Sequence, residues 1–299
     1  MISSSKRVSV EGHLLHQLTL MPVGEVRFAV MFYHGQGDHA DRYQEVLHPF
    51  TERGGMCVVM DLPGHGWSPG RRGHISDEDL LDRIIASCME GLEELPLVVA
   101  GHSMGGLLAL RHLEQSLAGK LRRPQMMWLS SPLLDPIQDR PKWFVRGVRW
   151  LASLVPELTI DTHVEEEMCR MVVPVSSQAD RSREEVDQRS GAKHSQLGHS
   201  RISIGWAVLL VEFAAKVQAC VAEVPKSLPI LLTQGSADEV CPAEKAQAFI
   251  KSLDSERAEY FELDGLLHEP FADERSHLVF AALDEWLDRT LPVVIDPAS

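Results

Sequence analysis

The sequence predicts a doubly wound α/β fold, with a mostly parallel sheet between two layers of helices and a helical lid inserted after a central strand. Through the first 130 residues, short apolar runs alternate with longer stretches of helical periodicity, and the same alternation resumes near residue 225. Strands buried on both faces of a parallel sheet have near-continuous apolar sequences, and crossover helices separate them. The segment between the two halves has no comparable apolar run, which indicates an insertion.

Four apolar runs are the strands expected in the first half, and three helical patterns lie between them. The strands are residues 26–34, 56–62, 95–102 and 124–132. The helices are residues 41–54, which end at a glycine as a C-cap would, 76–95, which open with the capping pattern of Ser76 to Asp79, and 105–119.

The second half repeats this pattern after the insertion. We expect a strand at 227–235, a helix at 241–253, a strand at 258–265 and a final amphipathic helix at 273–291. Residues 133–224 contain helix-like segments and a polar stretch at 178–201. The predicted organisation is therefore one core, residues 1–132 and 225–299, with a lid at residues 133–224.

Composition and charge narrow the class of function. Of the 299 residues, 44% are hydrophobic and 24% are charged, a balance typical of folded proteins. The 43 acidic and 29 basic residues give a formal net charge of −14, which repels nucleic-acid phosphates. We expect an enzyme or a small-molecule binding protein, with no nucleic-acid partner.

The cysteines and the N-terminus favour a cytoplasmic protein. The cysteines are scattered and form no CxxC pair, so we expect free thiols and no zinc or redox centre; they are Cys57, Cys88, Cys169, Cys220 and Cys241. The N-terminus lacks the apolar region of a secretory signal because Glu11, His13 and His16 interrupt it. No uninterrupted apolar run approaches the ~18 residues that span a bilayer.

The strongest chemical signal is GHSMGG at residues 101–106, a G-x-S-x-G motif between an expected strand and an expected helix. A nucleophile elbow needs this context, because only a sharp strand-to-helix turn lifts the serine Oγ clear of the sheet. The glycines at 101 and 105 let the two backbones approach closely. Ser103 is thus the candidate nucleophile; the alternative is an ordinary turn with Ser103 as an N-cap.

A serine nucleophile needs a base, and the base needs a carboxylate that fixes its tautomer. The chain order in such proteins is serine, acid, histidine. His268 follows the expected strand at 258–265 and can reach the serine from the carboxyl edge of the sheet, whereas His277 lies inside the final expected helix. We therefore expect His268 to be the base.

Asp238 is the preferred acid because it follows the expected strand at 227–235, where a carboxylate projects over the same edge. Its rival is Asp135, which follows the preceding strand. Asp264 lies on the same connection as His268 and fits a turn residue.

The tetrahedral oxyanion needs two backbone N–H donors, one from the residue after the nucleophile and one from the loop after an early strand. Met104 follows Ser103, and HGQG at residues 34–37 follows the strand at 26–34. We expect the N–H groups of Gln36 and Met104 to form the oxyanion hole.

Several motifs together resemble the monoacylglycerol lipase and lysophospholipase branch of the α/β-hydrolase superfamily, also described as serine aminopeptidase-like. They are HGQGDHADRY at 34–43, DLPGHGWSPGRRGH at 61–74, GHSMGG at 101–106, SSP at 130–132, GSADEVC at 235–241 and GLLHEPFADE at 265–274. The resemblance implies the same triad and oxyanion donors, mono-acyl lipid or small ester substrates, and no metal or organic cofactor. Residues 133–224 match only loosely, apart from SRISIGW at 200–206.

Two features near the expected site have alternative interpretations. The sequence from 141 to 158 predicts an amphipathic helix with Trp143 and Phe144 on its apolar face and basic residues on another. We favour the interpretation that this face covers the active site or core and contributes to substrate binding; the alternative is transient contact with a membrane. Cys241 is expected to be a buried apolar residue rather than a reactive thiol.

The hypothesis from the sequence is a serine carboxylic-ester hydrolase acting on monoacylglycerol or lysophospholipid-type esters through an acyl-enzyme. A peptidase or a thioesterase would use the same residues. A non-catalytic binding protein of the same fold would be expected to lack part of the constellation. The sequence indicates no oligomeric state, chain-length preference or headgroup.

Overall fold

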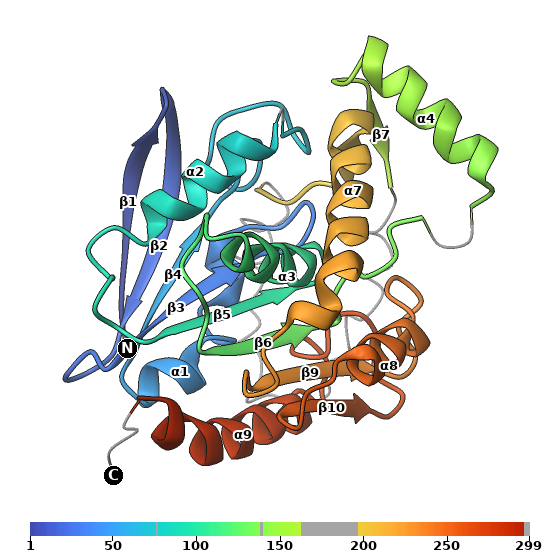
Figure 1. Ribbon diagram of the computed structural model, residues 1–299. Helices are drawn as coiled ribbons and strands as arrows, with labels where there is room; N and C mark the ends of the chain where they lie inside the picture. Colours follow the sequence, from blue (N-terminus) through green and yellow to red (C-terminus); the bar gives the residue numbers. More distant parts are fainter. Residues whose placement is uncertain (76, 138–139, 163–196, 296–299) are drawn as a thin grey trace, which may run out of the picture.

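The computed structural model describes residues 1–75, 77–137, 140–162 and 197–295, and its centre is an eight-stranded sheet (Figure 1). The strand order is β1-β2-β4-β3-β5-β6-β9-β10. Strands β3 to β10 of this sheet run parallel, and β2 pairs antiparallel with β1 and β4. The bounds are β1 Ile2–Val10, β2 His13–Met21, β3 Phe28–Tyr33, β4 Gly55–Met60, β5 Leu97–His102, β6 Met126–Ser130, β9 Ile230–Gly235 and β10 Ala258–Leu263.

Helices cover both faces of the sheet, as the doubly wound fold requires. Buried side chains of α2, α3, α7 and α8 share one core cluster with the sheet, and those of α1 and α9 share the other. Figure 1 shows α1 and α9 together below the sheet and α2 and α3 above it. The bounds are α1 His48–Glu52, α2 Glu78–Cys88, α3 Met104–Leu117, α7 Ile204–Cys220, α8 Ala243–Ser252 and α9 His277–Ile295.

The apolar runs that predicted the central strands are explained by burial on both faces. Along β3, Phe28, Val30 and Phe32 face one core cluster, and the residues between them face the other. Side chains alternate between the faces of a strand, so a strand with helices on both sides needs apolar residues at every position. Strands β3, β4, β5, β6 and β9 were predicted correctly for this reason; β10, an edge strand with the sequence AEYFEL, was predicted from the strand–helix alternation.

The N-terminal hairpin of β1 and β2 was not predicted. Strand β1 is an edge strand with the sequence ISSSKRVSV, and nearly all of its side chains are exposed. Polar and charged residues on an edge strand discourage pairing with another chain, but they also remove the apolar run that identified the other strands. Among the described strands, the hairpin is joined to the rest of the sheet by the pairing of β2 with β4.

Two expected helices differ from the structure. Residues 41–54 form a 3₁₀ turn at Ala40–Tyr43 and a separate α1 with Pro49 in its first turn, because a proline inside a continuous helix would remove a hydrogen bond and clash with the preceding turn. Helix α2 is capped by the side chain of Asp77, which accepts from Leu80 N, and it ends at Cys88 rather than near residue 95. Ser76 lies outside the described residues.

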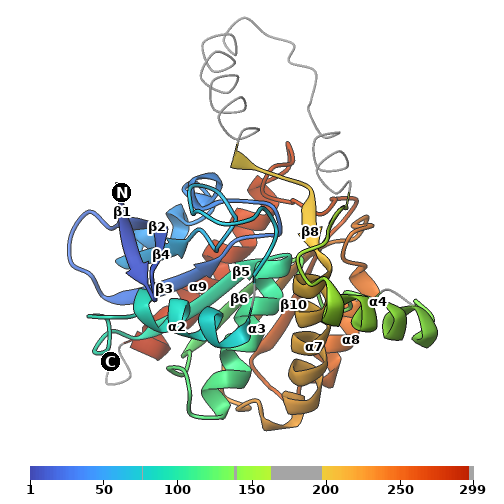
Figure 2. The same ribbon diagram turned by 90° about the horizontal axis from the view of Figure 1, so that it is seen from above.

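Between β6 and β9 the structure describes α4 (Lys142–Leu154), a two-stranded ribbon of β7 (Thr159–Asp161) and β8 (Arg201–Ser203), and α7. Figures 1 and 2 both show α4 projecting outward beside α7. Cys169 and most of the polar stretch at 178–201 lie outside the described residues. The four cysteines that are described, Cys57, Cys88, Cys220 and Cys241, are free thiols.

One described helix is long and apolar enough to cross a membrane by length and composition, over residues Ile204–Glu223. In the structure, α7 contacts α3 and α4. Its side chains of Trp206, Leu210 and Phe213 are buried in the core cluster formed with α2 and α3. One face of α7 is therefore buried against α3 and the core cluster.

Candidate active site

Ser103 occupies a strained turn between β5 and α3. Its φ is +55° and its ψ is −119°, a conformation that residues other than glycine rarely adopt and that persists only where the surroundings fix it. The backbone of Ser103 is held on both sides, because its N–H donates to Ser130 O at 2.9 Å and its carbonyl accepts from Leu133 N at 3.0 Å. Its side chain makes no capping hydrogen bond to α3, which argues against the simple N-cap interpretation.

The two glycines of the motif are required by close backbone contacts. A Cβ at Gly101 would collide with the backbone oxygen of Gly105, and a Cβ at Gly105 would collide with that of Tyr33. The start of α3 therefore lies directly against the ends of β3 and β5. This arrangement explains why both positions flanking the turn are glycine.

The structure brings together the three residues expected to form a triad. His268 Nε2 lies 2.8 Å from Ser103 Oγ, and His268 Nδ1 lies 2.8 Å from Asp238 Oδ2. The three residues follow β5, β9 and β10, whose carboxyl ends meet at one edge of the parallel sheet. The side chains of Asp238 and His268 are 0% and 7% exposed, so water barely reaches their hydrogen bond.

Asp238 is surrounded by hydrogen-bond donors. Its Oδ1 accepts from the backbone N–H groups of Val240 and Cys241 at 2.9 and 2.8 Å, and its Oδ2 accepts from Gln234 Nε2 at 2.8 Å. A carboxylate with this many donors is held in one orientation. It can therefore fix the position of the His268 ring.

The rival residues lie elsewhere. Asp135 forms an ion pair with Lys245 at 2.9 Å. Asp264 is exposed and accepts a 3.5 Å hydrogen bond from Ser236 Oγ. His277 is exposed at the first residue of α9, not inside the helix as expected. None of these three contacts Ser103 or His268 in the hydrogen bonds of the described residues.

The segment expected to supply an oxyanion donor lies beside the nucleophile. A Cβ built on Gly35 would lie 3.7 Å from Ser103 Cβ. Met104 is the first residue of α3, so its N–H has no acceptor inside the helix and can donate to a ligand. The backbone placement is thus compatible with N–H donors from Gln36 and Met104.

The side chain of Gln36 connects this loop to the segment that leads into α7. Gln36 Nε2 donates to Arg201 O at 2.8 Å, and Gln36 Oε1 accepts from the buried Trp206 Nε1 at 3.0 Å. His199 N donates to Gly37 O at 2.9 Å. The loop at 34–38 is therefore held by residues between His199 and Trp206.

A buried ionic bridge that the sequence did not predict joins the same loop to His268. Arg42 donates to both carboxylate oxygens of Glu269 at 3.0 and 2.9 Å and contacts Asp38 Oδ2 at 3.1 Å. Tyr43 OH donates to Asp38 at 2.6 Å and accepts from Gly35 N at 3.2 Å. Burial alone would raise the pKa of Asp38, but the Arg42 charge and the Tyr43 hydroxyl outweigh burial and lower it.

We expect Arg42→Gln and Glu269→Gln to show strong energetic coupling. Glu269 is 2% exposed, and a buried charge without its partner is strongly destabilising. Each variant should lower the free energy of unfolding, and a double-mutant cycle should give a coupling of about 1–3 kcal/mol. Urea unfolding of the four proteins measures the coupling. Additive losses would show that the pair does not act as a unit.

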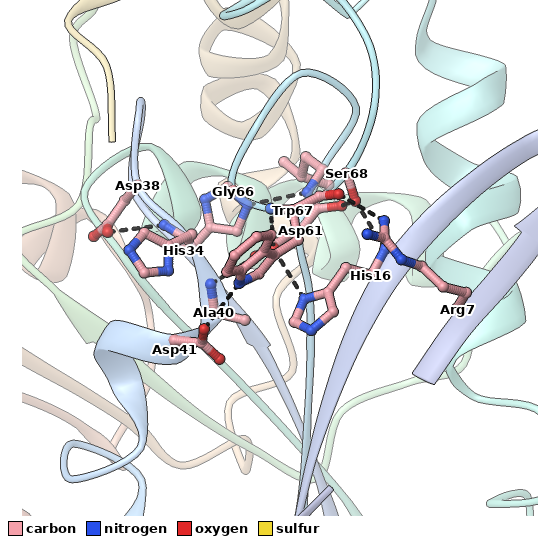
Figure 3. A network of polar contacts seen from close by, with 12 residues as sticks. Arg7, His16, His34, Asp38, Ala40, Asp41, Asp61, Gly66, Trp67 and Ser68 are labelled. Atoms are coloured by element: carbon pink, nitrogen blue, oxygen red, sulfur yellow. Dashed lines mark hydrogen bonds and ion pairs between the residues drawn. The ribbon is translucent and has the colours of Figure 1, made fainter. Parts of the chain in front are cut away.

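Asp61, in the motif at 61–74, fixes the neighbouring loop (Figure 3). Its carboxylate accepts from Ala40 N at 2.6 Å, from Trp67 N at 2.8 Å, and contacts His16 Nδ1 at 3.0 Å. Burial alone would raise the pKa of Asp61, but these hydrogen bonds and the nearby His34 lower it. The ionised side chain thus ties the loop after β4 to the segment that follows the Gln36 loop.

Two further titratable groups near Ser103 are neutral at physiological pH. Burial lowers the pKa of His102 well below its usual value, and its ring centroid lies 5.0 Å from that of His268. Burial raises the pKa of the Cys241 thiol well above its usual value, which supports the expectation of a packing role. Among the described residues, no group of His, Cys, Asp and Glu is arranged to hold a metal ion.

The two residues expected to bind substrate lie on α4 and are largely exposed. Trp143 is 69% and Phe144 is 43% exposed, and of this helix only Ala152 is buried. The apolar face does not cover the core within the described part of the chain. Its exposed apolar side chains include Trp143, Trp150 and Leu154, and α4 lies beside α7 (Figure 2).

Known proteins are similar to this chain in sequence and in fold. A family model described as serine aminopeptidase, S33, matches residues 24–275. A monoglyceride lipase of Rattus norvegicus is 23% identical over 96% of this chain and 90% of its own, and a phospholipase of Bacillus subtilis, YtpA, is 25% identical over 87% and 95%. The crystal structure of a monoacylglycerol lipase from Paleococcus ferrophilus superimposes with a TM-score of 0.71, at 26% identity over 91% of this chain and 98% of its own.

Proposed function

The chain belongs to the serine aminopeptidase (S33) family of α/β-hydrolases, and we propose that it is a serine ester hydrolase that cleaves mono-acyl esters of the monoacylglycerol or lysophospholipid type. The observation that carries the proposal is the unbroken hydrogen-bond chain from Ser103 through His268 to Asp238. The relatives described as monoglyceride lipase and phospholipase support a lipid ester as the substrate.

In the proposed mechanism, Ser103 attacks the ester carbonyl while His268 Nε2 accepts its proton. Asp238 keeps the other proton on Nδ1 and stabilises the imidazolium. The N–H groups of Gln36 and Met104 bind the oxyanion, and His268 then protonates the departing alcohol. Water repeats the sequence on the acyl-enzyme. This mechanism uses no metal or organic cofactor.

We further propose that residues 133–224 form a lid on a core of residues 1–132 and 225–299, and that the lid binds the acyl chain. The exposed face of α4 supports this role, because Trp143, Trp150 and Leu154 are between 61% and 69% exposed. An acyl chain gains ~0.8 kcal/mol per methylene that it buries. Trp143 and Phe144 are the proposed contacts at the start of this surface.

Replacing Trp143 and Phe144 together with serine is expected to weaken turnover of long-chain substrates selectively. The kcat/KM for a long-chain monoacylglycerol should fall about tenfold, or about 1.4 kcal/mol, with much less change for p-nitrophenyl acetate, which has little chain to bury. Val23→Ser, at a site that is 81% exposed, is the control for loss of an exposed apolar side chain. A proportional loss on both substrates would mean that α4 supports the fold and does not bind the chain.

A hydrolysis panel tests the proposed reaction class. Monoacylglycerols, lysophospholipids, p-nitrophenyl esters, acyl thioesters and aminoacyl amides all suit the same triad chemistry. The proposal requires that kcat/KM be highest for the mono-acyl oxygen esters. A preference for thioesters or amides would replace it, and no turnover together with no labelling of Ser103 by a fluorophosphonate would favour a binding protein.

A further inference from the structure

A hollow of about 430 Å³ lies between the loop after β4 and the β7–β8 ribbon, and three arginines line it. Arg71 and Arg72 come from the loop, and Arg201 comes from β8. The volume is within the ~300–1,000 Å³ of small-molecule sites. Three guanidinium groups in one hollow are unexpected on a chain with a formal net charge of −14.

The positive charge of this arginine hollow is only partly neutralised. Arg71 pairs with Glu157 at 2.9 Å, and among the described lining residues the one carboxylate is Asp161, which lies opposite Arg201 in the β7–β8 ribbon. Arg72 donates to the backbone oxygen of Gly66 at 2.9 Å. Within the described part of the chain, neither Arg72 nor Arg201 has a carboxylate partner in any ion pair. Guanidinium groups with unused N–H donors are the usual partners of phosphate oxygens.

The walls of the hollow are rigidly joined to each other. Ser203 N donates to Gly73 O at 2.9 Å, and His74 Nδ1 lies 2.8 Å from Ser203 Oγ. His199 Nε2 lies 3.2 Å from Gly64 O. The arginines are thus carried by two segments whose relative position is set in advance, which reduces the entropy lost on binding.

The same walls are joined to the proposed oxyanion loop. The backbone oxygen of Arg201 accepts a hydrogen bond from the side-chain N–H of Gln36, and the backbone oxygen of Gly37 accepts one from His199 N. The reacting ester carbonyl would lie at the N–H of Gln36. The hollow therefore shares Arg201 with the contact that holds the proposed oxyanion loop, and we place the alcohol part of an ester substrate on this side.

We propose that the arginine hollow binds the phosphate of the substrate headgroup, so that the enzyme prefers anionic mono-acyl phospholipids to neutral monoacylglycerols. This inference rests on the proposed ester-hydrolase function and names the headgroup that the sequence left open. The chemistry recognised is a phosphate monoester or diester one glycerol unit from the scissile ester. Arg72 and Arg201 supply its charge-assisted hydrogen bonds.

Two substrates that differ only in the phosphate test the inference. 1-Decanoyl lysophosphatidic acid and 1-decanoylglycerol are compared, each below its critical micelle concentration. The enzyme should have the higher kcat/KM for the phosphate ester, and Arg72→Gln and Arg201→Gln should each lower that value about tenfold or more, mainly through KM, with less than about twofold change for decanoylglycerol. Added KCl should reduce the preference because salt screens exposed charges.

The variants isolate the guanidinium groups. Arg201 holds Gln36 through its backbone oxygen, so Arg201→Gln leaves that hydrogen bond in place. Arg289→Gln removes an exposed cation on α9, which pairs with Glu259, and should leave both substrates unaffected. Equal losses on both substrates, or no preference in the wild-type enzyme, would overturn the headgroup assignment.

Orthophosphate distinguishes a headgroup from free phosphate as the ligand. It should compete with the phosphate ester and leave decanoylglycerol hydrolysis unchanged. If orthophosphate instead changes decanoylglycerol turnover, and Arg201→Gln abolishes that change, the hollow is a site for free phosphate and the proposal is contradicted. If the enzyme hydrolyses decanoylglycerol but the arginine variants do not lower kcat/KM selectively for the phosphate ester, this inference alone fails. If it hydrolyses neither lipid, the proposed function fails.

Discussion

Replacing Ser103 with alanine is expected to lower kcat/KM for mono-acyl esters by about 10³-fold or more while the protein remains folded. The variant removes one oxygen, and the backbone hydrogen bonds to Ser130 and Leu133 that hold the turn are unchanged. The residual rate comes from oxyanion binding and substrate positioning, which do not need the hydroxyl. Initial rates on a monoacylglycerol and labelling by a fluorophosphonate measure the loss.

Ser131 provides a matched control for this experiment. Ser131 is buried and, like Ser103, has a positive φ, +44°, and its Oγ has no hydrogen-bond partner among the described residues. Ser131→Ala should therefore keep most of the activity and most of the labelling. A Ser103→Ala enzyme with a tenth of the wild-type rate, or one that is still labelled stoichiometrically, would remove Ser103 from the role of nucleophile.

The sequence predicted the sheet well wherever burial on both faces dictated composition. Strands β3, β4, β5, β6 and β9 are near-continuous apolar runs, whereas β10 is a partly exposed edge strand that was predicted from the strand–helix alternation; the predicted boundaries of all six agree within a few residues. The N-terminal hairpin was missed because β1 is an exposed edge strand and has no such run. The break between the 3₁₀ turn and α1 was missed because Pro49 was treated as part of a longer helix.

The candidate triad could be predicted because each member follows a strand and the ends of parallel strands meet at one edge. The Arg42–Glu269 bridge could not be predicted in this way. Its two residues are 227 positions apart. Arg42 lies in the motif at 34–43, which was interpreted as the Gln36 loop, and Glu269 lies in the motif at 265–274, which was interpreted from His268. Likewise, the arginine hollow combines residues of the 61–74 motif with Arg201 of β8, and only the folded chain places them together.

Asp238→Asn is expected to lower kcat/KM about 10³-fold or more, whereas Asp135→Asn should have little effect. Gln234, Val240, Cys241 and His268 Nδ1 all direct N–H groups at the two oxygens of Asp238. Asparagine has one acceptor oxygen. If that oxygen accepts from Val240 and Cys241, its NH₂ group faces His268 and favours the tautomer with the proton on Nε2, which cannot accept the proton of Ser103.

The carboxylate of Asp135 pairs with Lys245 and not with His268. Both side chains of that pair are partly exposed. Partly exposed pairs contribute only about 0–1 kcal/mol, so the asparagine variant should fold and react nearly as the wild type does. Thermal unfolding of both variants separates loss of the base's orientation from loss of the fold. The reverse ranking of the two rates would assign the acid to Asp135, and equal mild losses would mean that neither carboxylate orients His268.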